Sequence, residues 1–408
     1  MKSALRWLLV PLLALALAAN CAVVYADDAA TVASECDISD VSTPLSVSVS
    51  AAAIGESLNI NAKSAVLMEA DTGSILYESN PDEPLPPASI TKIMSLLLIM
   101  ESIDRGDLKL EDKVTASAHA ASMGGSQIWL KENEVMTVDE LLKAAVIASA
   151  NDATVALAEK VSGSEEGFVA AMNEKAKLLG MNSTHFENAT GLDANGHIST
   201  AHDVAVMSRE LIGHELIKKY STVWMESLRD GKTELVNTNR LVRFYEGTTG
   251  LKTGTTSGAG YCLSATAERN GLSLVAVIMG GTTSTDRFEG AKKLLEYGYA
   301  NYVSKEVESE LPKTELQVKN GSEKTVPLEA AKSVKLLLKK SDASEITQKA
   351  EFREDITAPV KKGDKLGTLE FFCKDESIAA VPIIAAKDIK EKTLPFCFLS
   401  LLKGLFIL

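Results

Sequence analysis

Three short polar motifs follow one another along the chain, and their residue types suit serine-based acyl transfer. The first is Ser89-Ile90-Thr91-Lys92, whose spacing places a hydroxyl and an amine at i and i+3 on one face of a helix. A lysine in apolar surroundings has a lowered pKa and can take the serine proton, and Ile90, Ile93 and Met94 would supply those surroundings. In a first helical turn, the dipole would also favour negative charge developing on the serine. We therefore predict Ser89 as the nucleophile.

Two further motifs lie downstream. Ser149-Ala150-Asn151 falls at an expected junction between helices, where its hydroxyl and amide can reach a site, although helix capping explains it equally well. Lys252-Thr253-Gly254 puts an amine and a hydroxyl on a strand before a glycine, which suits a substrate carboxylate, and a turn at a sheet edge is its alternative. Singly, the patterns have low specificity, because Ser400-Leu401-Leu402-Lys403 repeats the first and Ser57-Leu58-Asn59 the second.

The hydrophobic pattern predicts the elements that must position these motifs. A helix is expected from Ser89 to about Ile103, and its stretch from Ile93 to Met100 is apolar on nearly every face, which predicts a helix buried at the centre of a domain. Thr137-Val138-Asp139-Glu140 is a capping-box pattern that opens another helix, and the next helix would be capped by Ser149 or Asn151. The other expected elements are helices over 152–161, 165–179, 201–213 and 286–302, and strands over 65–68, 74–77, 260–267 and 272–279, the last two joined at Asn270-Gly271. This order indicates an α/β-type sandwich with an antiparallel sheet.

The first 26 residues have the layout of a secretory signal peptide. Lys2 and Arg6 precede an apolar run over 7–19 that is too short to span a bilayer, and Val24-Tyr25-Ala26 offers a cleavage site. A lipoprotein signal acylated at Cys21 is the alternative, although the residue before that cysteine is not small. We therefore expect an exported protein.

The rest of the chain divides into four expected parts. Residues 27–60 are a predicted linker, residues 61–303 the main domain and residues 310–390 a small all-β domain, with strand-like runs over 316–318, 334–338, 366–372 and 378–384. The segment 394–408 is apolar but short for a spanning helix, so an anchor at the membrane surface is expected. The lysines upstream would face lipid head groups: Lys387, Lys390 and Lys392. A helix packed on the body or in a dimer is the alternative.

Composition limits the possible partners. The formal net charge of −13 argues against a nucleic-acid partner. The five cysteines are scattered and do not cluster with the five histidines, so neither a disulfide framework nor a zinc site is predicted. His197 and His202 are close enough in sequence to share a metal, but positions in a loop and at a helix start account for them. No cofactor and no metal are therefore expected.

Taken together, the three motifs form a known set. They are separated by 149 − 89 = 60 and 252 − 149 = 103 residues, and they match the Ser-x-x-Lys, Ser-x-Asn and Lys-Thr-Gly set of penicillin-recognising enzymes. From about residue 60 onward, the chain resembles the low-molecular-mass penicillin-binding proteins, the D-alanyl-D-alanine carboxypeptidases. The resemblance also covers Pro87–Met94, Thr190-Gly191-Leu192-Asp193, and Ser199-Thr200-Ala201 with Asp203. It implies a serine β-lactamase/transpeptidase-like α/β (α+β) domain, in which helices flank the sheet.

The resemblance implies roles for the motif residues. Ser89 would attack the carbonyl of the penultimate D-alanine and form an acyl-enzyme, with Lys92 as its base. Ser149 and Asn151 would relay protons and hold the peptide. The substrate end would be bound by Lys252 and Thr253, next to Gly254, and the oxyanion would lie between the backbone N–H groups of Ser89 and Thr255. The implied partners are peptidoglycan stem peptides and β-lactams, met at the extracytoplasmic face of the bacterial cytoplasmic membrane.

Three other residues match the family with a competing explanation for each. Arg240 and Arg287 fall near arginines that the family uses around the substrate carboxylate, but a surface ion pair explains each as well. Asp203 matches the family's loop aspartate, yet with Thr200 it also forms a plain capping box. These residues are predicted to bind or border the substrate, with structural roles as the alternative.

Other classes of protein explain less of the sequence. A class A β-lactamase uses Ser-Asp-Asn and a glutamate that activates water; here Ala150 replaces the aspartate, and Gly191 follows Glu187 where asparagine is expected. A non-catalytic muropeptide or penicillin sensor would often have lost Lys92 or Asn151, which are both present. A scaffold that binds partners through the β domain leaves the triple motif unexplained.

Overall fold

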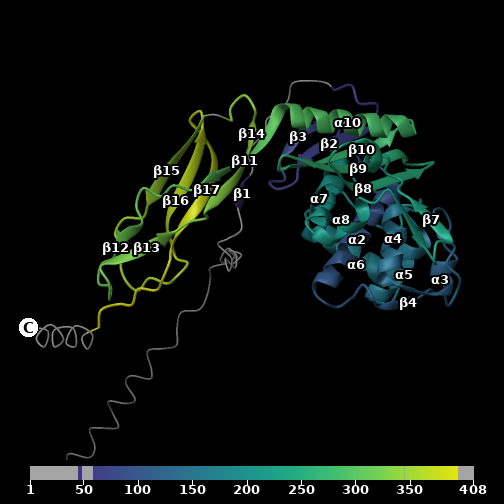
Figure 1. Cartoon of the computed structure of the whole chain (residues 1–408), viewed down its shortest axis with the longest axis horizontal. Helices are drawn as coiled ribbons and strands as arrows, with labels where there is room; N and C mark the ends of the chain where they lie inside the picture. Colours follow the sequence, from purple (N-terminus) through teal and green to yellow (C-terminus); the bar gives the residue numbers. More distant parts are fainter. Residues whose placement is uncertain (1–44, 48–57, 344, 394–408) are drawn as a thin grey trace, which may run out of the picture. The chain divides into compact units, whose positions relative to one another are not determined.

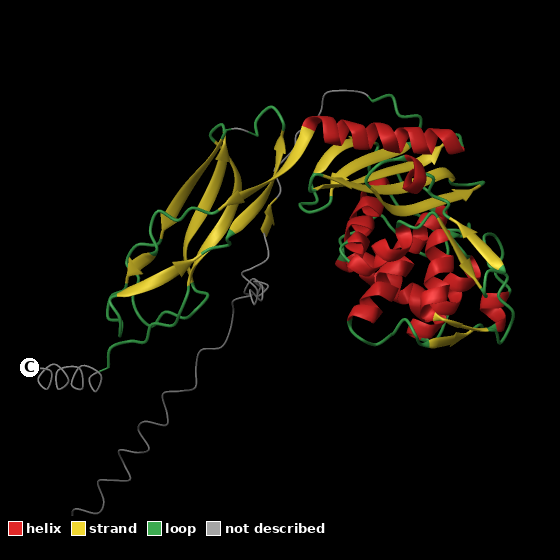
Figure 2. Ribbon diagram, in the orientation of Figure 1, coloured by secondary structure: helices red, strands yellow, loops and turns green. Residues whose placement is uncertain are grey.

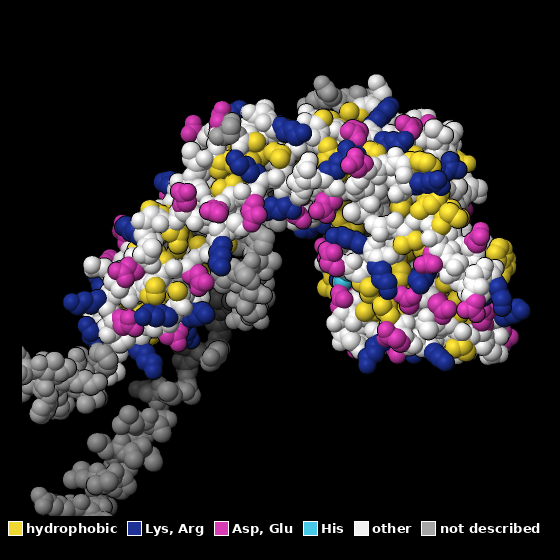
Figure 3. All heavy atoms as spheres, in the orientation of Figure 1, with side chains coloured by type: hydrophobic (Ala, Val, Ile, Leu, Met, Phe, Trp, Pro, Cys, Tyr) yellow, Lys and Arg dark blue, Asp and Glu magenta, His cyan; other side chains and the backbone are white. Residues whose placement is uncertain are grey.

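The computed structural model describes residues 45–47, 58–343 and 345–393 (Figure 1). The predicted signal peptide and the predicted tail anchor lie outside these residues, as does most of the predicted linker. Within the described part of the chain, no helix is both long and apolar enough to cross a bilayer. On the face drawn in Figure 3, basic and acidic side chains are interspersed instead of forming the basic stripe that nucleic-acid binding uses.

An antiparallel five-stranded sheet forms the middle of the main domain, in the order β3-β2-β10-β9-β8. Asn270 and Gly271, which join β9 to β10, both have positive φ, at 52° and 76°, and so suit a two-residue hairpin turn. The strands are β2 Ser64–Glu69, β3 Ile75–Ser79, β8 Thr248–Thr256, β9 Gly260–Arg269 and β10 Leu272–Gly281. The predicted antiparallel sheet is therefore confirmed.

Helices cover both faces of this sheet (Figures 1 and 2). One face carries α10 (Ser284–Asn301), whose inward side chains include Phe288 and Leu295 and whose start is fixed by a capping box between Thr283 and Asp286. The other face packs against a helical cluster around α2. That cluster and its neighbours are α2 Lys92–Asp104, α3 Ala118–Ala121, α4 Val138–Ile147, α5 Asn151–Ser162, α6 Glu165–Leu178, α7 Ala201–Ile212 and α8 Glu215–Ser221. The short α9 (Leu241–Phe244) instead packs its Leu241 into the core shared with α10. Two short hairpins border it: β4 Lys113–Thr115 with β5 Val135–Thr137, and β6 Met225–Leu228 with β7 Thr233–Val236.

The central helix is buried as predicted, but it begins later than the sequence pattern indicates. Ser89 lies in a 3₁₀ turn, η1 (Ala88–Thr91), and the α-helix starts only at Lys92. Ala88 has a φ of 50°, which is outside the helical region, so a regular helix cannot continue back through Ala88. The nucleophile candidate therefore lies on the turn that leads into the buried helix.

The junction between α4 and α5 also differs from the prediction. The capping box at Thr137 is present, but the N-cap of α5 is Ala150 and no side chain caps this helix. Ser149 has a φ of 62°, in the left-handed region, so its side chain cannot take the geometry of a cap. The capping predictions for Ser149 and Asn151 are wrong, and both side chains are available to the site.

The C-terminal part of the described chain is all β. Its sheets have the strand orders β12-β13-β17-β16-β15 and β1-β14-β11, the last including β1 (Leu45–Val47) from within the predicted linker. The strands are β11 Tyr302–Glu308, β12 Glu315–Gln317, β13 Thr325–Glu329, β14 Ser333–Lys339, β15 Ile346–Phe352, β16 Lys365–Cys373 and β17 Glu376–Ala385. The four predicted strand runs are confirmed. Strands β11, β13 and β15 were missed; alternate residues of β15 are exposed and polar, which leaves only a faint apolar pattern.

Candidate active site

The first two motif residues meet at the start of the buried helix. Lys92 is fully buried, and its Nζ lies 3.0 Å from Ser89 Oγ. Two oxygens complete its surroundings: Asn151 Oδ1 at 2.6 Å and the backbone carbonyl of Thr190 at 2.7 Å. The amine therefore has three polar partners, one of which is the hydroxyl predicted to react.

The lowered pKa of Lys92 decides how these three partners are used, because a charged ammonium group could donate to all three of them. Burial holds the pKa of Lys92 well below its ordinary value, and the charge of Lys252 lowers it further, against a smaller opposing effect of Asp152. A neutral amine has two N–H donors and one lone pair. The amide oxygen of Asn151 and the carbonyl of Thr190 can only accept, so they take the two N–H groups. The lone pair is then directed to the Ser89 hydroxyl, the one partner that can donate.

The second lysine approaches from the sheet. Lys252 on β8 is buried, and its Nζ lies 2.6 Å from Ser149 Oγ. Burial lowers the pKa of Lys252 to about 7, with the charge of Arg287 as the second cause. A pKa near 7 allows this amine both to give and to take a proton at neutral pH. The left-handed backbone at Ser149 turns its hydroxyl toward β8, so the helical layer and the sheet meet in this pair.

Two glycines allow the backbone to close around the Ser89 turn. A Cβ placed on Gly191 would lie 1.8 Å from the carbonyl oxygen of Ala88, and Gly191 also has a φ of 83°. A Cβ on Gly254 would lie 2.8 Å from the carbonyl oxygen of Pro87. Any larger residue would force these segments apart. The loop that supplies the Thr190 carbonyl and the strand that carries Lys252 therefore both depend on glycine for their approach.

An arginine from α10 holds the C-terminal end of β8. Arg287 is largely buried, and its Nη1 donates to Thr255 Oγ1 at 2.9 Å and to the carbonyl of Gly254 at 3.0 Å. Thr253 Oγ1 donates to Thr238 Oγ1 at 2.7 Å. Arg287 thus fixes the end of the strand predicted to receive the substrate carboxylate, and adds positive charge beneath it.

Arg240 and Asp203 lie outside this cluster of contacts. Arg240 is exposed at the N-cap of α9 and has no side-chain partner among the described residues. Burial is the main cause that lowers the pKa of Arg287, and the charge of Arg240 adds a smaller effect in the same direction. Asp203 is buried, and its Oδ2 accepts from Thr184 Oγ1 at 2.7 Å and from the Ser183 N–H at 3.2 Å. Its own N–H donates to Thr200 Oγ1. Thr200 therefore caps α7, but the Asp203 carboxylate binds Ser183 and Thr184 in place of the Thr200 N–H, so only half of the capping-box alternative is found.

The backbone groups that orient Asn151 and the hydrogen bond between His197 and Thr91 were not predicted from the sequence. Asn151 is oriented by the carbonyl of Gly124, 2.7 Å from its Nδ2, and by the carbonyl of Ser126, 2.7 Å from its N–H. Backbone acceptors have no side-chain signature, so a sequence pattern cannot reveal them. His197 is also buried, with its pKa lowered by burial to about 4, and is therefore neutral. Its Nδ1 accepts from the Glu187 N–H, so its Nε2–H donates to Thr91 Oγ1, at 2.8 Å.

Metal chemistry and lactamase-type water activation find little support in this geometry. Among the described residues, no group of three or more His, Cys, Asp or Glu side chains lies together as a metal site would require. Glu187, the residue considered for a lactamase role, is half exposed, and its carboxylate contacts His185 Nε2 at 3.1 Å. The site consists of a serine, two buried lysines and their supporting amide, hydroxyl and backbone groups, which defines a serine acyl-transfer enzyme of the penicillin-recognising class.

Comparisons with known proteins make this class more specific. Residues 48–283 match the family described as D-alanyl-D-alanine carboxypeptidase, and residues 304–391 match the C-terminal domain of penicillin-binding protein 5. The chain is 45% identical over 335 residues to D-alanyl-D-alanine carboxypeptidase DacF of Bacillus subtilis (strain 168), covering 81% of this chain and 86% of that protein. The chain belongs to the D-alanyl-D-alanine carboxypeptidase family of serine peptidases.

Solved structures agree with this assignment. Penicillin-binding protein 5 from Haemophilus influenzae has a TM-score of 0.74 and 30% identity, covering 83% of this chain and 100% of that one. Penicillin-binding protein D2 from Listeria monocytogenes, in its ampicillin-bound form, has a TM-score of 0.55 and 32% identity, covering 60% and 100%. The predicted resemblance, fold class and serine carboxypeptidase activity are therefore confirmed, and the β-lactamase and sensor alternatives are not supported.

Proposed function

We propose that this serine carboxypeptidase removes the terminal D-alanine from peptidoglycan stem pentapeptides through an acyl-enzyme on Ser89. The contact between Ser89 Oγ and the buried Lys92 Nζ carries the proposal, because the two acceptor-only partners of this amine leave its lone pair for the hydroxyl. Ser89 attacks the carbonyl carbon of the penultimate D-alanine as its proton passes to Lys92. The C–N bond then breaks, and water later hydrolyses the ester.

The leaving group needs a proton, and the second lysine pair can supply it. Ser149 lies against Lys252, whose pKa of about 7 permits transfer at neutral pH. In this proposal, Ser149 protonates the departing D-alanine amine and is reprotonated from Lys252. Asn151, held by two backbone carbonyls, keeps Lys92 in place and lies beside the peptide.

The substrate carboxylate would bind at the end of β8. Lys252, Thr253 and Arg287 gather donors and positive charge there, with Gly254 allowing close approach and the exposed Arg240 extending the positive field. The N–H groups of Ser89 and Thr255 lie on the two segments that Gly254 brings into contact, and would stabilise the oxyanion between them.

β-Lactams would enter the same site as analogues of the D-Ala-D-Ala terminus. A relative of this chain has been solved with ampicillin bound. Neither Ser89 nor Lys92 has a carboxylate among its hydrogen-bond partners in the described residues, so a water that attacks the penicilloyl ester has no ready base of that kind. We infer slow release of the acylated enzyme.

Release of D-alanine from a pentapeptide ending in D-Ala-D-Ala tests the proposal. The wild-type protein should release it, and Ser89→Ala should lower the rate at least about a thousandfold, as loss of an activated nucleophile does. Ser122→Ala, which changes an exposed serine on the same domain, is the matched control and should keep the wild-type rate. Release by Ser89→Ala at the wild-type rate would show that another residue is the nucleophile.

We also propose that the enzyme is exported and held at the extracytoplasmic face of the membrane. The basic, apolar and cleavage-site segments at the start of the sequence support export. The apolar segment 394–408, with Lys387, Lys390 and Lys392 upstream, supports attachment at the membrane surface. Fractionation of a chain truncated before residue 394 tests this attachment.

A further inference from the structure

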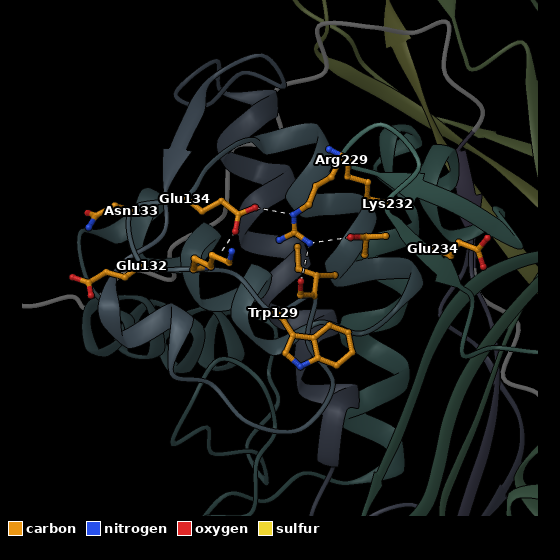
Figure 4. Close-up of a pocket in the computed structure, with 10 residues that line it drawn as sticks. Trp129, Glu132, Asn133, Glu134, Arg229, Lys232 and Glu234 are labelled. Carbon is orange, nitrogen blue, oxygen red and sulfur yellow. Dashed lines mark hydrogen bonds and ion pairs between the residues drawn. The ribbon is translucent and has the colours of Figure 1, made fainter.

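A cavity in the main domain is lined by none of the motif residues (Figure 4). It has a volume of about 740 Å³ and lies between the loop before β5 and the β6–β7 hairpin. The side chains of Trp129, Lys131, Glu132, Asn133, Lys232 and Glu234 border it. This volume falls in the range that holds a small organic ligand.

Trp129 has two features that folding does not explain. Its side chain is 72% exposed, although an indole gains free energy from burial, and its backbone has a φ of 55°, which is unfavourable for a bulky residue. The backbone on each side of it is fixed, because the buried Asp152 carboxylate accepts from the N–H groups of Ile128 and Leu130 at 3.0–3.2 Å. The backbone that presents the indole to solvent is thus fixed, and backbone strain of this kind is typical of functional positions.

The same segment is tied to the active site. Asp152 directly follows Asn151, whose amide contacts Lys92 and whose N–H donates to the carbonyl of Ser126. Trp129 is three residues beyond Ser126, a stretch of chain that spans at most about 11 Å. A substrate that extends a short way beyond the reacting D-alanine can therefore reach this cavity.

Charge in the cavity is balanced. On its floor, Arg229 Nε donates to Glu134 Oε1 at 2.7 Å, and Arg229 Nη1 donates to the carbonyl of Ile128 at 2.9 Å and to Thr233 Oγ1 at 3.0 Å. The exposed rim has two lysines and two glutamates, so its formal charges cancel, and Asn133 adds an amide. None of these five rim side chains has a hydrogen-bond or ion-pair partner within the described chain: Lys131, Glu132, Asn133, Lys232 and Glu234.

We propose that this cavity binds the glycan of peptidoglycan, an inference that rests on the proposed function. A flat indole beside unpartnered donors and acceptors of both signs suits a neutral ring with many hydroxyl and N-acetyl groups. A stem peptide carries charged groups, and balanced rim charges give those no net attraction. The indole face covers the apolar face of a sugar ring, and the rim side chains take its hydroxyl and acetamido groups. The cavity therefore recognises the sugar to which the stem peptide is attached.

The test compares two soluble substrates that share one pentapeptide: the free peptide and the same peptide on its N-acetylated disaccharide. The wild-type protein should have the higher kcat/KM on the disaccharide form. Trp129→Ala should reduce the ratio of the two kcat/KM values about fivefold or more, which is the typical worth of one aromatic contact, and Trp129→Tyr should keep most of it. Phe244→Ala removes an aromatic residue that is 65% exposed outside this cavity, and should leave the ratio at its wild-type value.

Two results would overturn the inference. One is an equal kcat/KM for both substrates in the wild type. The other is an equal gain from a longer peptide without sugar, because the cavity would then read peptide. The proposed function is judged separately, by hydrolysis of the free pentapeptide in the wild type and its loss in Ser89→Ala. Binding can also be followed without turnover, as quenching of Trp129 fluorescence by the peptide-free disaccharide in Trp224→Phe prepared without residues 1–26, where the emission of Trp7 and Trp224 is removed.

Discussion

Replacing Lys252 by methionine should change how the stability of the protein depends on pH. The pKa of Lys252 is lowered from 10.5 to about 7 by burial and by Arg287. Between these two values the unfolded chain binds a proton at this side chain and the folded chain does not, so wild-type stability rises with pH. The interval is roughly 3.5 pH units, and at about 1.4 kcal/mol per unit it amounts to about 5 kcal/mol.

The variant lacks the buried charge that destabilises the folded wild type at low pH, but it also loses one hydrogen bond. Lys252→Met leaves the Ser149 hydroxyl without its partner at 2.6 Å, which costs about 1–3 kcal/mol. At pH 7 and below, where both states of the wild type carry the proton, the variant should be more stable by about 2–4 kcal/mol. As pH rises the advantage shrinks, and the two stability curves should cross near about pH 9.

Thermal unfolding from pH 6 to pH 10 measures this effect. Below pH 7 the variant should unfold several degrees above the wild type, and near pH 10 at or below it. Lys160→Met removes an exposed lysine from α5, and its unfolding temperature should change with pH in parallel with that of the wild type. Parallel curves for Lys252→Met and the wild type would refute the argument, because they would mean that Lys252 is protonated in the folded protein throughout. The variant should also lose D-alanine release, since Lys252 holds Ser149.

Two further outcomes follow from the structure. Gly191→Ala should abolish acylation by penicillin, because its Cβ would lie 1.8 Å from the Ala88 carbonyl oxygen beside Ser89. The control Gly106→Ala shares the positive φ but has open space around it, so it should cost only about 1 kcal/mol of stability and keep the acylation rate. Equal acylation rates in the two variants would contradict this prediction. Deleting residues 394–408 should move the protein from the membrane fraction to the soluble fraction, and unchanged fractionation would remove the case for the anchor.

Much of the architecture could be predicted, because it depends on local patterns. The hairpin at Asn270-Gly271, the capping box at Thr137 and the apolar run from Ile93 to Met100 each have a signature within a few residues. The helix start and the cap of α5 could not be predicted, because they depend on positive φ at Ala88 and Ser149. Those conformations are held by contacts with segments distant in the sequence, which no local pattern records.

The candidate site, like the fold, has a part that the sequence predicts and a part that it does not. Ser89, Lys92, Asn151, Ser149 and Lys252 are side chains with recognisable spacing, and the structure brings them together. Their supports were not predictable, because the carbonyl that receives the second N–H of Lys92 and the carbonyls that orient Asn151 are backbone atoms. Arg287 was predicted only through the resemblance to the family, because an arginine that fixes a distant strand end has no local signature.

Acyl transfer in this protein depends on Ser89 as the nucleophile, and mass spectrometry of the penicillin-treated protein tests that residue directly. The protein should gain one penicilloyl group per chain, lose it slowly, and yield a single labelled peptide in which the adduct maps to Ser89. Ser89→Ala should gain none. An adduct on another serine, or stoichiometric labelling of Ser89→Ala, would contradict the account.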